Sequence, residues 1–284
     1  MGESQAPAGA ATLALGVVTY NNGPGQLAHL LRSIELAAGA AAGRAAVEVY
    51  AVDNGAESAW PESAVALRRV EPVGNVGFAR GMNLLLAAAF ADARTRWFLC
   101  VNPDGVLHRR CLDELLAADE ARPGALVEAR QFPEEHKKIY DARTLESPWA
   151  SGACLLIPRE IYEAVGGFDP NFFMYHEDID LSWRARSAGF SVRLAPGALF
   201  GHSVLDRRPS PSVEKFFLTS GRYLAHKWGC GRFREWVEGL MVERGLCPSR
   251  AELPPLPEPG PGAAALDPSV PNFEHGFNFA PVRW

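Results

Sequence analysis

The stretch Phe172-Phe173-Met174-Tyr175-His176-Glu177-Asp178-Ile179-Asp180-Leu181-Ser182-Trp183-Arg184 places three carboxylates directly after an aromatic run. Behind the acids, apolar residues recur at helical spacing, at Leu181, Ala185 and Ala188. Gly189 ends this pattern, so we expect a helix that begins at the acids. Carboxylates in the first turn of a helix commonly cap free backbone N–H groups and complement the helix dipole. Capping is one explanation for each acid taken alone, and for Asp180 in particular.

The residues before the acids suggest a second explanation. Gly166-Gly167-Phe168-Asp169-Pro170 predicts a tight turn, and the residues from Phe172 to Tyr175 add apolar walls. We therefore expect the set of carboxylates to face a partly dry cleft. An acid held in such a cleft can act as a general base.

Composition and charge limit the class of protein. The chain has 284 residues, of which 48% are hydrophobic and 21% charged, as in an ordinary globular protein with one large domain and an appendage. The net charge of −5 and the pI near 5.8 argue against nucleic acid as the main partner. An anionic ligand must therefore be bound by local groups.

The cysteines and the N-terminal region indicate a cytoplasmic protein. The five cysteines are widely spaced and include no CxxC pair, so we expect neither a disulfide framework nor a zinc site. The apolar run from Ala10 to Val18 lacks the basic flank of a signal peptide and is too short to span a bilayer.

The first part of the chain predicts a parallel βαβ unit. Strands are expected at 12–20 and 47–52, with a helix between them, and a further strand at 65–70. Polar residues follow the first two strands at the edge where ligands bind in open α/β sheets: Thr19, Tyr20, Asn21, Asp53 and Asn54. The alternative for Asp53 is a turn residue before Gly55.

A glycine-rich stretch then leads into a helix. Gly74-Asn75-Val76-Gly77-Phe78-Ala79-Arg80-Gly81-Met82-Asn83 can offer free N–H groups to a phosphate, although its spacing fits neither G-x-G-x-x-G nor the P-loop. Arg80 and Asn83 lie about one helical turn apart, so a cation and an amide would share one face.

The apolar strand 97–101 runs into Asn102-Pro103-Asp104-Gly105. A carboxylate on a short turn at a buried strand end is suited to Mg²⁺ or Mn²⁺, and the alternative is a type I turn with Asp at a favoured position. A helix is expected at 109–121, whereas 128–144 gives no clear periodicity.

Residues 149–158 predict a strand whose small first residues, Ser151 and Gly152, would let a ligand approach the backbone. A short helix is expected at 159–165. Short strands are expected at 192–194 and 198–200, and His202 follows the second of them. Its place after a strand makes His202 a candidate ligand, although a lone histidine is more often structural.

The C-terminal part predicts a helical extension and a tail. Aromatic and basic residues interleave from 215 to 244, with breaks at Gly229 and Gly231. This run suits either helices packed on the main domain or peripheral contact with a membrane. Residues 252–271 are proline-rich and predict a linker. The predicted units are a disordered 1–10, a domain 11–205, an extension 206–250, and a linker with an aromatic tail 251–284.

The ordered series of motifs resembles family 2 glycosyltransferases with a GT-A fold, and in particular the bacterial rhamnosyltransferase-like members. The resemblance covers residues 12 to about 205 and rests on these stretches: 19–21, 52–55, 74–83, 102–104, 151–153, 166–169 and 177–181. It implies a Rossmann-like mixed sheet flanked by helices. The first acid of the family's DxD motif is Asn102 here, which makes metal dependence less secure.

The resemblance also implies roles. Asp178 would be the catalytic base, Asp53 would bind the nucleoside, and Asp104 with His202 would bind Mg²⁺ or Mn²⁺. The expected donor-binding residues are Thr19, Tyr20, Asn21, Asp53, Asn54, Gly77, Arg80, Asn83, Asn102 and Asp104. The expected acceptor-binding residues are Trp149, Ser151, Gly152 and Glu177.

The expected activity is inverting transfer of a sugar, such as rhamnose or a hexose, from a nucleotide-diphosphate sugar to a glycan or lipid-linked glycan acceptor. One base without a candidate nucleophile implies direct displacement. A hydrolase that uses Asp178 and Glu177 is the runner-up, but neighbouring helix residues point in different directions. A non-catalytic module that binds nucleotide sugar or glycan is the alternative from another class.

Overall fold

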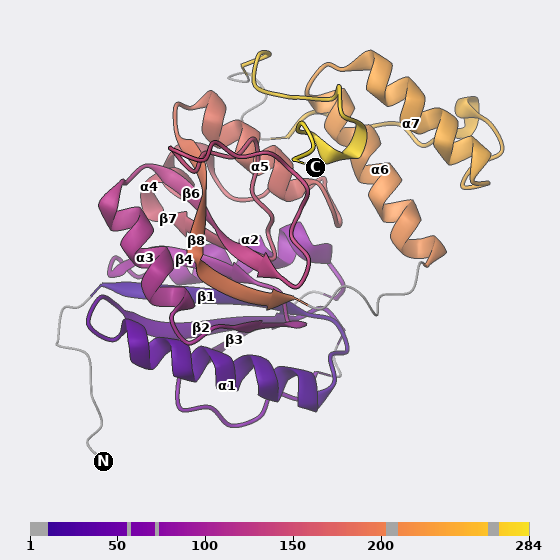
Figure 1. Ribbon diagram of the computed structural model, residues 1–284. Helices are drawn as coiled ribbons and strands as arrows, with labels where there is room; N and C mark the ends of the chain where they lie inside the picture. The colour runs from indigo at the N-terminus through magenta and orange to yellow at the C-terminus, as the bar shows by residue number, and fades with distance from the viewer. Residues whose placement is uncertain (1–10, 56–57, 72–73, 203–209, 261–266, 284) are drawn as a thin grey trace.

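A computed structural model describes residues 11–55, 58–71, 74–202, 210–260 and 267–283 (Figure 1). Its centre is an eight-stranded sheet in the order β3-β2-β1-β4-β7-β6-β8-β5. The strands are β1 (Thr12–Thr19), β2 (Ala46–Asp53), β3 (Ala66–Val70), β4 (Thr95–Val101), β5 (Gly105–Leu107), β6 (Ala125–Phe132), β7 (Cys154–Pro158) and β8 (Ser191–His202). The first four are parallel, and β7 and β5 run antiparallel to their neighbours.

Helices cover both faces of the sheet. They are α1 (Pro24–Ala41), α2 (Gly77–Phe90), α3 (Cys111–Ala121), α4 (Arg159–Val165), α5 (Glu177–Ser187), α6 (Pro211–Lys227) and α7 (Gly231–Glu243), with 3-10 turns η1 (Arg250–Glu252) and η3 (Gly276–Asn278). Side chains alternate across the strands, so that Leu99 packs with α1 and α3 while Phe98 packs with the helices of the other face. That second face holds α2, α4, α5, α6 and α7.

Most predicted elements are confirmed. The strands expected at 12–20, 47–52, 65–70 and 97–101 correspond to β1, β2, β3 and β4. The helix expected at the acids is α5, and Glu177, Asp178 and Asp180 lie in its first turn. The short helix expected at 159–165 is α4, and the helices expected on either side of Gly229 are α6 and α7.

Three predictions on the second half of the sheet were wrong or incomplete. The strand expected at 149–158 begins only at Cys154, because side chains bind the amides of the preceding residues, as Ser182 Oγ does for Ala150 N at 3.0 Å. The two short strands expected at 192–194 and 198–200 form one strand, β8, with a register shift opposite Ala129 and Arg130. The unassigned segment 128–144 starts inside β6, where the polar side chains of Glu128 and Gln131 are buried and Phe132 is exposed, so the hydrophobic alternation of a strand is lost.

The C-terminal helices share the core of the second face. Their buried side chains contact residues of α5 and of the segment after α7, and they include Leu218, Leu224, Trp228, Phe233 and Val237. The packed aromatics are thus largely those of the run 215–244, although Trp236 is 45% exposed. The proline-rich segment is also in contact, because Arg222 donates to Pro254 O at 2.7 Å.

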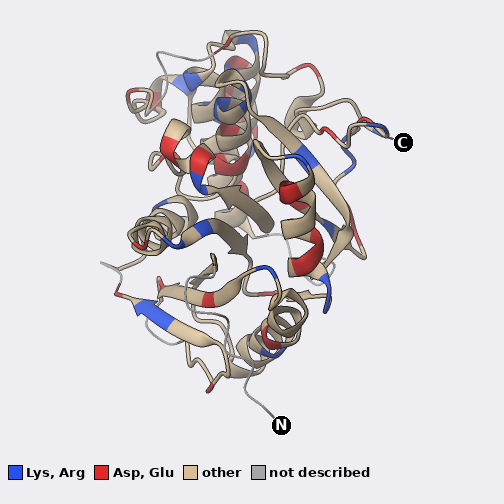
Figure 2. Ribbon diagram, turned by 90° about the vertical axis from the view of Figure 1, so that its left-hand side faces the viewer, with Lys and Arg blue, Asp and Glu red and all other residues tan. Residues whose placement is uncertain are grey.

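The charged residues are interleaved. Figure 2 shows basic and acidic segments distributed over the sheet and the helices alike. Among the described residues, no helix is long and apolar enough to cross a bilayer.

Candidate active site

The first part of the site lies at the carboxyl ends of β1 and β2. The sheet register pairs Thr19 with Asp53, and Thr19 Oγ1 donates to Asp53 Oδ1 at 3.0 Å. The same carboxylate accepts the backbone N–H groups of Gly55 at 3.1 Å and Ser58 at 2.8 Å. Burial raises the pKa of Asp53, but these hydrogen bonds outweigh it and hold the pKa below its ordinary value. The carboxylate is therefore ionised and fixed.

The neighbouring polar residues take several positions. Tyr20 is 60% exposed, and Asn21 adopts a left-handed conformation with a φ of 53°. A Cβ at Gly55 would stand 2.0 Å from Asn21 Oδ1, so only glycine permits this close approach. Asn54 Nδ2 donates to Gly77 O at 3.0 Å, which connects the end of β2 to the start of α2.

The glycine-rich stretch is held against the residues that precede α5. Gly77 has a φ of 79°, and a Cβ there would lie 2.2 Å from Phe173 O. Phe78 N donates to that same oxygen at 2.8 Å. Asn83 uses both amide atoms on the backbone of Phe168, and Arg80 Nε donates to Pro170 O at 2.9 Å. Arg80 and Asn83 therefore lie on one face of α2, and both bind the backbone of residues 168–170 before α5.

A second polar group joins the turn after β4 to the end of β8. Because Gly105 pairs with His202 in the sheet, Asp104 Oδ1 lies 3.1 Å from His202 Nε2. Asn102 Nδ2 is 3.4 Å from the same ring nitrogen. On the other side of the ring, Nδ1 lies 3.0 Å from Gln131 Oε1.

These residues fit a divalent cation. Since Gln131 Oε1 is an acceptor, Nδ1 is assigned the ring proton, and Nε2 then presents a lone pair to the Asp104 carboxylate. Asp104 Oδ1 and His202 Nε2 are 3.1 Å apart, a contact that a shared proton or a bound cation would stabilise, and an oxygen with an imidazole nitrogen suits Mn²⁺. Within the described residues, no group of three His, Cys, Asp or Glu side chains is positioned as a metal site.

Asp178 lies beside the loop 149–152. Gly152 N donates to Asp178 Oδ2 at 2.9 Å, and Ile179 N donates to Oδ1 at 2.8 Å. The side chain is partly exposed. Burial raises the pKa of the Asp178 carboxyl, and the two backbone N–H groups oppose this shift in part. A carboxyl with a raised pKa and a fixed orientation can accept a proton.

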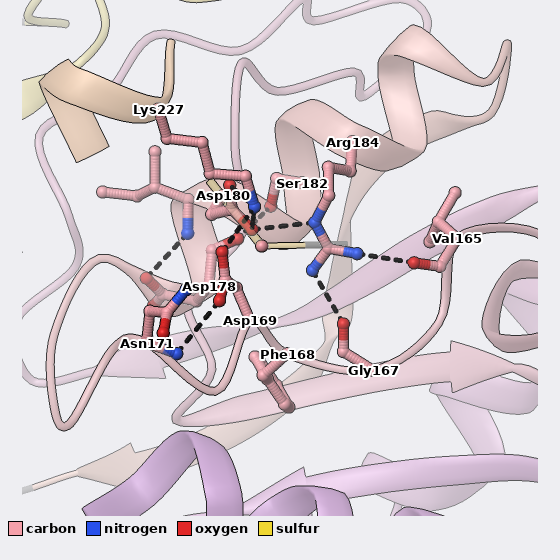
Figure 3. Close-up of polar contacts among 12 residues, drawn as sticks. Val165, Gly167, Phe168, Asp169, Asn171, Asp178, Asp180, Ser182, Arg184 and Lys227 are labelled. Carbon is pink, nitrogen blue, oxygen red and sulfur yellow. Dashed lines mark hydrogen bonds and ion pairs between the residues drawn. The ribbon is translucent and has the colours of Figure 1, made fainter. Parts of the chain in front are cut away.

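The other two acids of the helix are placed differently. Glu177 is buried, its Oε2 is without a hydrogen bond among the described residues, and burial raises its pKa well above the usual range. Asp180 is fully buried and binds Arg184 Nε at 2.7 Å and Trp228 Nε1 at 3.1 Å. Lys227 Nζ lies 2.8 Å from both Asp180 Oδ1 and Asp169 Oδ2 (Figure 3). Asp180 therefore joins α5 to α6, and its carboxylate is not accessible to a substrate.

The expected acceptor-binding residues lie on the loop before β7. Ser151 and Gly152 are buried beside Asp178. Trp149 is buried as well, with 6% of its surface exposed. Trp149 is covered because Lys138 Nζ lies 3.6 Å from its ring centroid and its Nε1 donates to Asn278 O at 2.9 Å.

Sequence reasoning missed several residues around the site. They are Glu128, Gln131, Lys138, Asp169 and Lys227. The first three lie in or after β6, where periodicity gave no assignment. The signal that could have found Asp169 is its place in the predicted turn 166–170, whereas only tertiary packing brings Lys227 to it.

Comparison with known proteins identifies similar sequences and folds. Residues 125–220 match the family described as glycosyltransferase like family 2. An N-acetylglucosaminyl-diphospho-decaprenol L-rhamnosyltransferase of Mycobacterium tuberculosis is 30% identical over 228 residues, which cover 64% of this chain and 72% of that protein. A low-salt glycan biosynthesis hexosyltransferase of Haloferax volcanii is 21% identical and is covered to 55%.

The solved structures share the fold. A structure of GalNAc-T7 with UDP, GalNAc and Mn²⁺ superposes with a TM-score of 0.58 at 12% identity, covering 86% of this chain. The structure of TarS from S. aureus gives a TM-score of 0.54 at 14% identity, covering 84% of this chain. The chain spans about half the length of these two proteins, 52% and 44%. The fold is GT-A, as the sequence motifs predict.

Proposed function

This chain is a glycosyltransferase of family 2, and we propose that it transfers a sugar from a nucleoside-diphosphate sugar to an acceptor hydroxyl with inversion, using Asp178 as the general base. The observation that carries this proposal is the Asp178 carboxylate, held by Gly152 N–H at 2.9 Å and Ile179 N–H at 2.8 Å. Both contacts come from fixed backbone, so the carboxylate is oriented before a substrate binds.

The proton transfer follows from the chemistry of this group. As the acceptor oxygen attacks the anomeric carbon, the bond from that carbon to the diphosphate breaks, and Asp178 takes the hydroxyl proton. Each carboxylate oxygen accepts one backbone N–H group and retains a lone pair for this proton. Glu177 supports direct displacement rather than hydrolysis by two acids, because its side chain is buried whereas Asp178 reaches the loop 149–152.

The donor end of the site is proposed at the strand ends. Asp53, fixed by Thr19 and Ser58, would accept hydrogen bonds from the nucleoside, and the exposed ring of Tyr20 would contact the base. Asp104 and His202 would hold Mn²⁺ or Mg²⁺, which is the ion class present in the GalNAc-T7 structure. When bound, such an ion neutralises the negative charge that develops on the leaving diphosphate.

The named activities of the relatives suggest the substrates. We infer a rhamnosyl or hexosyl donor and a glycan acceptor on a lipid diphosphate, because the mycobacterial relative is named for such a reaction. The corresponding location is the cytoplasm, with peripheral contact at the inner face of the membrane.

Donor binding and transfer should be measured separately. Isothermal titration of the purified chain against dTDP-rhamnose, UDP-hexoses and GDP-mannose with Mn²⁺ is expected to identify one tight donor. Product analysis with a polyprenyl-diphosphate glycan acceptor is then expected to show a new linkage of inverted anomeric configuration. Tight donor binding with neither transfer nor donor hydrolysis would instead indicate a non-catalytic binding module.

A further inference from the structure

A buried ion pair lies next to the proposed base on a segment for which the sequence gave no assignment. Lys138 Nζ donates to Glu128 Oε2 at 2.7 Å, and the two side chains are 7% and 4% exposed. A buried ion pair often contributes no more to folding than a well-packed apolar pair of the same volume. Its presence is therefore better explained by what it does at this place.

The pair contacts both ends of the loop 149–152. Lys138 Nζ lies 3.6 Å from the centroid of the Trp149 ring, where a cation interacts favourably with the aromatic face. Glu128 is hydrogen-bonded by the backbone of Ser151. The next residue, Gly152, donates its N–H to Asp178 Oδ2 at 2.9 Å. Consecutive backbone groups of one loop are thus bound by two carboxylates, those of Glu128 and Asp178.

Lys138 itself is fixed by the chain that follows α7. Lys138 pairs with Val282 in an antiparallel bridge, and Ile139 N donates to Pro281 O at 2.9 Å. Arg283 donates to Glu135 Oε2 at 2.6 Å. The backbone on both sides of Lys138 is therefore held, so the ammonium group stays in place.

The charges around Asp178 make Lys138 important. The titratable groups that interact with Asp178 are Glu177 on α5, Cys100 on β4, Glu128 on β6, and Lys138. Burial raises the pKa of Glu177, Cys100 and Glu128, and Lys138 is the cation among these groups. Its charge lowers the pKa of Asp178, against the effect of burial.

From these contacts we propose that the Lys138–Glu128 pair is a positioning device for the base: it fixes the loop 149–152 against Asp178 and sets the charge next to that carboxylate. The expected change in kcat rests on the proposed function, whereas the contacts of the pair with the loop and with Asp178 do not. Lys138 is a positioning residue and does not touch the reacting atoms.

The test compares Lys138→Met, Glu128→Gln and the double variant. Without Lys138, the pKa of Asp178 rises further, so the acid limb of the kcat profile should move to higher pH, with donor Kd unchanged. Without Glu128, a negative charge is lost and the limb should move down. The double variant restores the local net charge, so its limb should return close to that of the wild type.

Two controls separate positioning from simple loss of stability. Arg222→Met breaks the partly buried Arg222–Glu238 pair on α6 and α7 and should lower stability without moving the limb. If Lys138→Met does not fold, the other two variants still test the proposal. The acid limb of the kcat profile should move to lower pH in Glu128→Gln and should stay in place in the double variant.

A second readout does not depend on turnover. The Asp178 carboxyl can be titrated by ¹³C NMR, with Asp178→Asn to assign its signal, and should show the same three displacements. An Asp178 that titrates at one pH in all three variants overturns the positioning proposal. A wild-type chain that transfers no sugar instead counts against the proposed function, while the NMR titration still tests the pair.

Discussion

At the scale of single residues, Asp178 and Asp180 show how position decides the role of a carboxylate. The two lie in the same turn of α5, yet Asp178 is partly exposed and bound by backbone N–H groups, whereas Asp180 is enclosed by Arg184, Lys227 and Trp228. Successive residues of a helix point about 100° apart, so two positions two residues apart face nearly opposite directions. Only the first of the two can meet a substrate.

Asp178→Asn should separate binding from chemistry. The amide keeps the shape of the side chain but cannot accept the proton, so turnover should fall by roughly 100-fold or more. Donor binding should persist, because the proposed donor-binding residues lie at the ends of β1, β2 and β4 and Asp178 lies on α5. In the wild type, activity should fall as the pH decreases through the pKa of Asp178, which burial raises above the ordinary value of an aspartate.

Measurements of kcat and of donor affinity by calorimetry check this prediction. Asp180→Asn is not a matched control because it breaks the buried pair with Arg184. Asp113→Asn, at a partly exposed acid in the first turn of α3, is the control. Near-normal turnover of Asp178→Asn would contradict the base assignment and direct attention to Glu177.

Asp104→Ala should act on the donor instead. The carboxylate faces His202 Nε2 at 3.1 Å, and its loss removes an anionic ligand from the proposed cation site. Nucleoside diphosphate should then bind more weakly in Mn²⁺, and the difference between titrations with and without Mn²⁺ should shrink. Equal binding in both titrations of the wild type would mean that backbone N–H groups and cationic side chains alone bind the diphosphate.

His176 provides a pH dependence of stability. Burial among aromatic rings lowers its pKa from 6.5 to about 3. The unfolded chain takes up a proton near pH 6.5 and the folded chain does not, so the stability contributed by the neutral form is lost as the pH falls below 6.5. Between pH 6.5 and pH 5 the free energy of unfolding should decrease by about 2 kcal/mol from this residue. Denaturant titrations at both pH values should show a smaller decrease for His176→Phe, and an equal decrease would exclude His176 as the cause.

The site residues differ in how far the sequence could predict their placement. Asp53 and Asp104 follow strongly apolar strands, so hydrophobic patterns alone place them at the ligand-binding edge. The meeting of Asp104 with His202 depends on the register of β5 with β8, which the sequence did not show. Lys138 lies outside regular elements, and its partner Glu128 is a charged residue inside a buried strand, so no periodic pattern indicates either one.

At the scale of elements, a buried ionic network joins α5 to α6. Lys227 of α6 lies 2.8 Å from both Asp169 Oδ2 and Asp180 Oδ1, and Arg184 extends to Val165 O at 2.6 Å and Gly167 O at 2.7 Å (Figure 3). Two carboxylates and two cations balance one another without solvent. The loop before α5 and the helix α6 are thus fixed to the helix that carries the proposed base.

Lys227→Met should destabilise the fold strongly. The change leaves Asp169 without its cation in a buried place, and breaking one partner of such a network costs about 3–5 kcal/mol. Chemical denaturation measures the loss. Arg32→Met, which removes a helix-surface pair whose arginine is 69% exposed, should change stability by less than about 1 kcal/mol. A similar small change in Lys227→Met would mean that water or a neighbouring group compensates the carboxylate.

The errors in predicting elements have a common physical cause. The loop 149–153 has the composition of a strand, but its amides bind Ser182 and Asp178 of a helix that lies later in the chain. The sequence predicted two separate strands at 192–194 and 198–200, whereas the pairing of β8 with β6 continues across a register shift. Local patterns report periodicity, and in both cases partners distant in sequence determined the hydrogen bonding.

At the scale of the whole molecule, the C-terminal part belongs to the main core. Phe279 is fully buried and its ring contacts Trp183 of α5 at 5.7 Å, Phe233 of α7 at 5.7 Å and His176 at 5.2 Å between centroids. Residues 276–283 also reach Lys138 and Trp149 beside the proposed base. This segment therefore connects three parts of the fold that are distant in sequence.

We accordingly expect the sheet domain and the C-terminal helices to unfold in one cooperative transition. Because they share a core, neither part can open without exposing apolar surface of the other.

Phe279→Ala should lower the free energy of unfolding by about 3–5 kcal/mol, the range for truncation of a buried phenylalanine. Tryptophan fluorescence, which is sensitive to Trp183 and Trp228 near α6, and far-UV circular dichroism should give coincident midpoints in the wild type and in the variant. Phe132→Ala, at a side chain that is 66% exposed, is the matched control and should leave both midpoints nearly unchanged. Two separated transitions, of which Phe279→Ala moves only one, would show instead that the C-terminal helices form an independent unit.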